Sequence, residues 1–155
     1  MKEIKIGQGL GNIKFGYTRE ELKKVLGEPD EIDKYSYTNS DTDLTESWHY
    51  DDSEISVSFD QEDDWLLGAI SVSSDEFLFN GQKLIGKSEE EVLSYIMSIY
   101  PEDIEHEFTN YEDDPERILV SFEDLSLSLW FMNGILEEIE WGVLWDDADM
   151  QIWPE

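Results

Sequence analysis

The chain is similar to itself at an offset of 70 residues, and this internal repeat constrains its fold more than any other feature. Residues 15–22 (FGYTREEL) align with residues 85–92 (IGKSEEEV), which keep the Gly and two Glu and replace Thr by Ser. The same offset relates apolar positions that alternate with Ser in both halves, namely Ile55, Val57 and Phe59 with Leu125, Leu127 and Leu129. We therefore expect a duplicated structural unit.

Both aligned segments predict the start of a helix. Thr18 and Ser88 are the expected N-cap residues, because each stands three positions before a glutamate that completes a capping box. We expect the first helix to run to about Leu26 and end at Gly27, and the second to run to about Tyr100.

Strands are expected after each helix. The pair Asn133-Gly134 predicts a two-residue hairpin, and Asn80-Gly81 predicts a smaller one at the junction of the two units. Residues 125–132 alternate between Leu125, Leu127, Leu129 and Phe131 on one face and Ser126, Ser128, Trp130 and Met132 on the other. This is the pattern of an antiparallel sheet with one buried and one open face.

These patterns predict an α+β fold class with two tandem helix-plus-antiparallel-strand units. The helices are expected to pack on one face of a shared or paired antiparallel sheet. The first unit is expected to span residues 1–74 and the second residues 75–144, the two forming one compact domain. Residues 145–155 are expected to form an acidic C-terminal tail that contains Trp.

Charge is unevenly distributed along the 155 residues. Ten Lys and Arg stand against 39 Asp and Glu, for a net charge of −29, and the first 34 residues are neutral, so the whole excess lies in residues 35–155. Such a field repels nucleic acid and anionic membranes and attracts cationic proteins. Acidity can also serve solubility alone, but at this density we expect a basic protein partner, with no direct nucleic-acid or membrane binding. Mutual repulsion between such chains favours a monomer.

The cellular compartment is predicted from two features. The chain has no Cys, and its N-terminus lacks the apolar run of a signal peptide. We therefore expect a cytoplasmic protein.

Motifs for catalysis or cofactor binding are sparse. His49 and His106 stand 57 positions apart without a surrounding motif, and His49 is expected to point to the Ser-bearing face of a strand. Residues 60–64 and 146–149 cluster carboxylates, but they lack the Gly and Glu of an EF-hand calcium loop. We predict a non-enzymatic protein with no cofactor and no specific metal site, and leave loose cation binding open.

A family resemblance rests on the first predicted helix. Residues 15–22 (Phe-Gly-x-Thr-x-x-Glu-Leu) and 26–29 (Leu-Gly-x-Pro) resemble the helix-opening motif of the beta-lactamase-inhibitor-like fold, which small outer-membrane assembly lipoproteins share. The second repeat matches this motif in part. The resemblance implies a tandem duplication whose curved sheet clasps a protein target. The lipid-bearing Cys of the lipoproteins and the paired Cys of secreted inhibitors are missing, and what remains resembles the cytoplasmic immunity proteins of bacterial toxin–immunity pairs.

Three acidic clusters with aromatic neighbours are the predicted partner-binding residues, since aromatic side chains rimmed by charge are typical of binding hot spots. Together with Trp130 on the open face, these residues are Asp60, Glu62, Asp63, Asp64 and Trp65; Tyr111, Glu112, Asp113 and Asp114; and Trp145, Asp146, Asp147, Asp149 and Trp153. In the alternative interpretation, the loops are solvated turns and the Trp residues of the tail pack on the protein's own core.

The predicted function is that of an acidic immunity protein, an antitoxin that binds a basic toxin domain, expected to be a nuclease, and occludes its active site. Nucleases are basic because they must bind a phosphate backbone. The alternative is an acidic nucleic-acid mimic that regulates a DNA- or RNA-binding protein.

Overall fold

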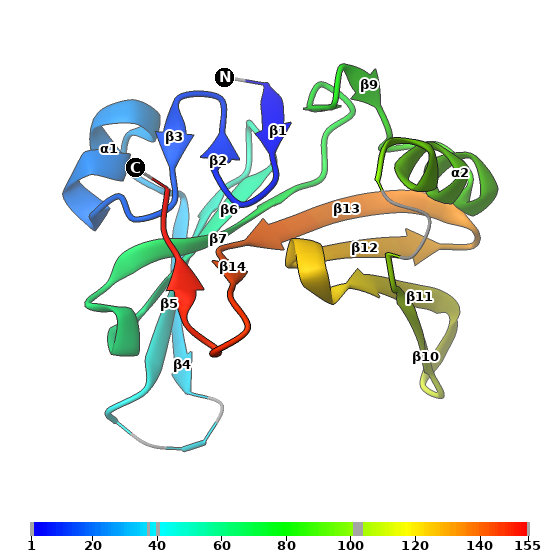
Figure 1. The fold of residues 1–155 in the computed structure, drawn as a ribbon. Helices are drawn as coiled ribbons and strands as arrows, with labels where there is room; N and C mark the ends of the chain where they lie inside the picture. The colour runs from blue at the N-terminus through cyan, green and yellow to red at the C-terminus, as the bar shows by residue number, and fades with distance from the viewer. Residues whose placement is uncertain (1, 37, 40, 101–103, 155) are drawn as a thin grey trace.

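Strands make up most of the regular structure of the chain (Figure 1). The computed structural model describes residues 2–36, 38–39, 41–100 and 104–154, with 47% strand and 17% helical residues. In chain order the elements are β1 (Glu3–Lys5), β2 (Gly9–Leu10), β3 (Ile13–Lys14), α1 (Arg19–Leu26), β4 (Glu31–Ser36), β5 (Leu44–Tyr50), β6 (Ile55–Asp60), the 3-10 turn η1 (Gln61–Asp63), β7 (Leu66–Val72), β8 (Leu78–Phe79), β9 (Gln82–Lys83), α2 (Glu89–Ile99), β10 (Glu107–Tyr111), β11 (Asp114–Phe122), the 3-10 turn η2 (Glu123–Leu125), β12 (Leu127–Met132), β13 (Ile135–Gly142), β14 (Leu144–Trp145) and β15 (Gln151–Ile152).

The largest sheet has eight strands in the order β10-β11-β12-β13-β7-β6-β5-β4, and all its neighbours are antiparallel. Each half of this sheet is a meander. The halves meet where β13 pairs with β7, from Ile139 opposite Val72 to Gly142 opposite Ala69. A five-stranded sheet, β3-β2-β1-β8-β9, and the two-stranded ribbon β14-β15 complete the structure.

The predicted fold class is wrong. Over its described residues, the chain is mostly β with two α-helices, and it forms one large antiparallel sheet and two smaller sheets rather than two helix-plus-strand units. The strands β13 and β7 would be edge strands of separate units, but they hydrogen-bond to each other, which satisfies backbone groups that an exposed edge leaves unpaired. The second sheet pairs β1 in parallel with β8, with Glu3 opposite Leu78 and Ile4 opposite Phe79, and the internal repeat does not predict this pairing.

Both helices begin where the capping pattern predicts. Thr18 accepts a hydrogen bond from the backbone N–H of Glu21, whose carboxylate accepts one from the Thr18 N–H, so the capping box is complete. Ser88 caps α2 by accepting from the N–H of Glu91. Each helix also ends within one residue of its predicted end. Within the described ranges, no helix has the length and apolarity needed to cross a membrane.

The two Asn-Gly hairpins are confirmed. Asn133 and Gly134 join β12 to β13 with φ of 53° and 79°, and Asn80 and Gly81 join β8 to β9 with φ of 50° and 83°. A type I′ turn needs positive φ at both central residues, which Asn and Gly adopt at low cost. Local sequence therefore determines these two registers.

The hydrophobic core lies on one face of the large sheet. In Figure 1, α1, α2 and the β1–β3 strands all lie on the same side of this sheet. Leu22 of α1 and Val92 and Ile96 of α2 are fully buried in the core. Trp141 of β13 donates through Nε1 to the carbonyl oxygen of Gly9 at 3.0 Å, which ties the two larger sheets together. The helices leave the opposite face of the large sheet uncovered.

Candidate functional site

The uncovered face of the large sheet carries small polar side chains. Along β6 and β12, buried apolar residues alternate with partly exposed ones, half of them Ser, which confirms the predicted alternation. The strand register places serines opposite one another in three pairs: Ser47 with Ser58, Ser56 with Ser71, and Ser121 with Ser128. Small side chains leave hollows on this face that larger ones would fill.

Two glutamates of β13 lie at the middle of this face. Glu140 stands between Ser128 of β12 and Ser71 of β7 in the register, and Glu138 stands opposite Trp130. Within the described residues, the carboxylate of neither glutamate makes a hydrogen bond or an ion pair. Burial raises the pKa of Glu140, and the negative charge of Glu138 raises it further. The ionised form of Glu140 therefore lacks a compensating cation.

Four hollows form a row along this face, because neighbouring hollows share lining residues. A hollow of about 380 Å³ between β4 and β6 shares His49 and Ser56 with one of about 200 Å³ at the middle of the sheet. The middle hollow shares Ala69 and Glu140 with a third of about 200 Å³. The third shares Trp145 with a fourth, of about 840 Å³, beside β14.

We call this row of four hollows the acidic trough. Its acidic lining residues are Glu31, Asp33, Asp51, Glu54, Asp60, Asp63, Glu123, Asp124, Glu138, Glu140, Asp146, Asp147 and Asp149. No Lys or Arg of the described residues lines it. The chain has ten basic side chains, so this uniform sign marks a surface suited to a cationic ligand.

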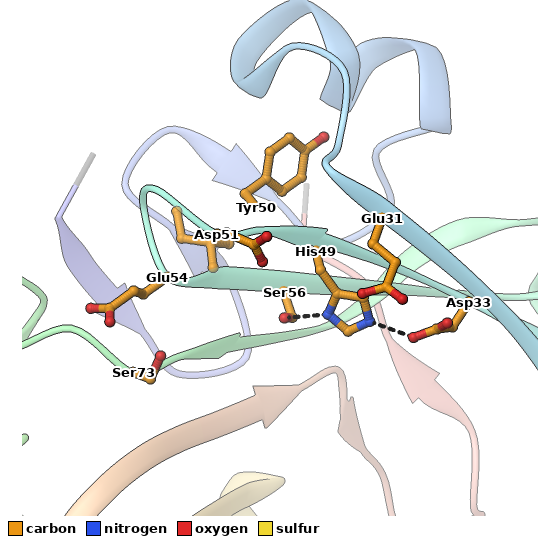
Figure 2. Close-up of a pocket in the computed structure, with 9 residues that line it drawn as sticks. Glu31, Asp33, His49, Tyr50, Asp51, Glu54, Ser56 and Ser73 are labelled. Atoms are coloured by element: carbon orange, nitrogen blue, oxygen red, sulfur yellow. Dashed lines mark hydrogen bonds and ion pairs between the residues drawn. The ribbon is translucent and has the colours of Figure 1, made fainter.

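The first hollow contains a chain of three polar side chains (Figure 2). The Nδ1 atom of His49 lies 2.8 Å from Ser56 Oγ, and its Nε2 atom lies 3.0 Å from Asp33 Oδ2. The position of His49 on the Ser-bearing face confirms the prediction. Nucleophilic catalysis by Ser56 would also need donors for an oxyanion. Because β6 is paired with a strand on each side, its own backbone N–H groups are used in the sheet.

The first predicted cluster is divided by the fold. Asp60 and Asp63 line the trough, and Asp63 accepts a hydrogen bond of 3.0 Å from Gln151 of β15. Trp65 instead packs against the core with the guanidinium of Arg19 4.7 Å from its ring centroid. Among the other residues of this cluster, Glu62 belongs to η1 and Asp64 follows it, and neither lines the trough.

The second predicted cluster lies at the β10–β11 edge of the sheet. Tyr111 stacks on Trp130 with ring centroids 5.9 Å apart, and the guanidinium of Arg117 lies 4.2 Å from the Trp130 ring. Glu112 and Asp113 form the turn that leads to Asp114, the first residue of β11. The structure thus brings Tyr111 to Trp130 on the open face but places the carboxylates of this cluster outside the trough.

The predicted C-terminal tail forms the β14–β15 ribbon. Asp146 closes its turn by accepting from the backbone N–H groups of Ala148 and Met150 at 2.9 and 3.0 Å. Trp145 is 56% exposed and lines the largest hollow of the trough together with three aspartates of the tail. Trp153 packs against the core. Packing on the protein's own core, the alternative interpretation, therefore holds for Trp153, while Trp145 is exposed and its contact with a partner stays a prediction.

Sequence reasoning missed the glutamates at the centre of the trough. The period-2 pattern of residues 135–142 contained the signal, because Ile139 and Trp141 are apolar and their neighbours Glu138 and Glu140 must then face the other way. It also missed Glu123 and Asp124, which join the trough only because η2 lies beside β14. In the part of the chain that the structure describes, no group of three or more His, Cys, Asp or Glu is arranged to hold a metal ion.

Comparison with known proteins identifies no relative. The chain matches no family model, no curated protein and no solved structure. Its candidate site is therefore interpreted from geometry and charge.

Proposed function

We propose that this chain is an acidic immunity protein that binds a strongly basic toxin domain, a nuclease by expectation, and neutralises it by occluding its active site. The observation that carries the proposal is the acidic trough, which crosses an uncovered sheet face and is lined by carboxylates without a Lys or Arg of the described residues. The net charge of −29 adds long-range attraction for a cationic partner.

The chemistry of the partner follows from this surface. A nuclease neutralises phosphates with Lys and Arg, so the entrance to its active site is cationic. A row of carboxylates competes for the same side chains that bind the nucleic acid. Trp145, which is exposed and lies among the aspartates of the ribbon, supplies apolar contact area within the charged surface.

The mode of action requires no covalent step by this chain. Charge speeds the encounter and fixes the orientation, while the serines and Trp145 allow close approach of the two surfaces. Neutralisation by one monomer in the cytoplasm, where a toxin nuclease meets its substrate, fits a chain without Cys.

The experiment is co-expression with the C-terminal domain of a toxin encoded directly upstream, followed by purification at about 150 mM salt. The expected result is a stable complex in which the nuclease activity of the toxin is lost. Recovery of the two proteins separately, or of a complex that still cleaves nucleic acid, would overturn the proposal. If the toxin is ignored while a purified host DNA- or RNA-binding protein is inhibited, the nucleic-acid mimic is the correct function.

A further inference from the structure

The middle hollow of the trough differs from the others in how its acidic groups are enclosed. Glu138 and Glu140 line it together with hydroxyl groups and the small side chain of Ala69, within a volume of about 200 Å³. Its hydroxyl-bearing lining residues are Tyr35, Ser47, Ser56, Ser58 and Ser71. The two carboxylates lie two residues apart on β13, and their side chains therefore share one face of the strand.

Another carboxylate of the same sheet shows what these two glutamates lack. Glu46 is buried on β5, and its carboxylate lies 3.1 Å from Arg19 Nη1 and 3.4 Å from Lys34 Nζ, while Trp48 Nε1 donates to it at 2.6 Å. The fold thus provides two cations and a donor for Glu46. Among the described residues, the fold provides no cation and no hydrogen-bond donor for the carboxylates of Glu138 and Glu140.

We propose that Glu138 and Glu140 receive an arginine side chain of the basic partner, which inserts into the middle hollow as the central anchor of the interface. This inference rests on the proposed function and specifies the partner's chemistry at that surface. The guanidinium group is planar and carries five N–H donors, which match two carboxylates flanked by hydroxyl acceptors better than the compact ammonium of lysine does.

Two further observations support this assignment. The raised pKa of Glu140 shows that its charge is poorly solvated in the free protein, so a cation that enters the hollow gains more there than at an exposed carboxylate. Trp130 stands opposite Glu138 in the strand register, and it already stacks with the guanidinium of Arg117 at 4.2 Å. A guanidinium–aromatic contact thus already exists on the open face next to the hollow, with Tyr111 stacked on the same ring.

The test is calorimetric titration of the full chain with hexa-arginine and hexa-lysine peptides at about 150 mM salt. Glu140→Gln is expected to weaken hexa-arginine binding on the order of tenfold, the scale of one charge-assisted contact. The matched control is Glu137→Gln, which removes the same charge from an exposed residue of the same strand outside the hollow, and should change binding less than about twofold. Equal losses in the two variants, or equal affinity for the two peptides, would overturn the inference.

A second variant tests the hollow without changing charge. Ser58→Leu should fill the space beside Glu140 and reduce hexa-arginine binding, while hexa-lysine, held by the wider acidic surface, is less affected. Thermal unfolding of each variant checks that the fold is intact. Unchanged hexa-arginine binding by a folded Ser58→Leu variant would show that no side chain enters the hollow.

The failure of this inference can be told apart from failure of the proposed function. If a toxin domain binds Glu140→Gln as tightly as the wild-type chain, the arginine subsite is wrong and the immunity function stands. If no toxin domain binds but Glu140→Gln still weakens hexa-arginine relative to Glu137→Gln, the subsite stands and the partner is another arginine-bearing protein.

Discussion

Glu46 and Glu140 are carboxylates of the same sheet, yet the fold shifts their pKa values in opposite directions. Burial raises the pKa at Glu46, but the Trp48 N–H, the Arg19 guanidinium and Lys34 together more than offset burial, and the pKa falls below its ordinary value. At Glu140, burial acts in the same direction as the neighbouring negative charge, and the pKa rises. The first arrangement is typical of a structural carboxylate, and the second is typical of a binding surface.

Glu140→Gln is expected to stabilise the free protein at neutral pH by up to about 1 kcal/mol, because the amide removes the repulsion between like charges. The folded pKa of Glu140 lies above its unfolded value, so the wild-type protein loses stability as pH rises through the interval between them, and the variant does not. Urea unfolding between about pH 4 and 8 measures the difference. An equal gain in unfolding free energy in the exposed Glu137→Gln control would contradict the view that the repulsion is specific to Glu140.

Glu46→Gln is expected to cost about 1–2 kcal/mol at neutral pH, because the amide loses its ion pairs with Arg19 and Lys34 while it keeps an acceptor for Trp48. The folded pKa of Glu46 lies below its unfolded value, so its contribution is present above the unfolded value and is lost as pH falls through the folded one. The unfolding free energies of wild type and variant should therefore converge in acid. A gap that does not vary with pH would show that the ion pairs add no stability.

At the scale of elements, the pairing of β7 with β13 decides the architecture. Gly142 of β13 lies opposite Ala69, and a Cβ atom at Gly142 would come within 2.8 Å of the Gly68 carbonyl oxygen. The N–H of Val143 donates to this same oxygen at 3.1 Å. The two strands thus approach each other closely where the halves of the large sheet join, and glycine leaves room for that approach.

Gly142→Ala is expected to destabilise the protein by about 1–3 kcal/mol, because the added methyl group overpacks the junction of β7 and β13. Gly68→Ala is the matched control, since a Cβ atom there meets nothing closer than 4.0 Å, and it should change stability by about 0.5 kcal/mol or less. Urea unfolding of both variants provides the comparison. A larger cost at Gly68 than at Gly142 would contradict this account of the junction.

For the whole molecule, the helices cover one face of the large sheet (Figure 1). The other face carries the acidic trough. Acidic residues also lie on the helix side, among them Glu20 of α1 and Glu90 of α2. Net charge alone therefore attracts a cationic partner from every direction, and only the local concentration of carboxylates in the trough can orient it.

Changing Asp146, Asp147 and Asp149 to Asn should slow association with a basic toxin domain on the order of tenfold at low salt and flatten its salt dependence. Asn keeps the side-chain oxygen that closes the turn of the ribbon. The control changes three exposed acidic residues outside the trough, Glu20→Gln, Asp75→Asn and Glu90→Gln. Stopped-flow association rates compare the two. Equal slowing would mean that total charge, and not the trough, steers the encounter.

The sequence by itself determined the features that depend on neighbouring residues. The caps at Thr18 and Ser88 and the turn at Asn133-Gly134 follow from backbone preferences within a few positions. The alternation of Leu with Ser assigned each side chain to a face, because the strand period is two wherever strands pair. These predictions held although the fold class was wrong.

Only the tertiary structure decided which elements lie side by side. Two of these contacts join segments that are distant in sequence, namely the pairing of β13 with β7 and the hydrogen bond between Gln151 and Asp63. The different environments of Trp145, which is exposed, and Trp153, which packs against the core, depend on which segment covers each of them. Local propensity does not encode such contacts, because their free energy comes from shared burial and paired strand edges. The acidic composition is evident from the sequence, but only the fold brings the acidic side chains together in one trough around Glu140.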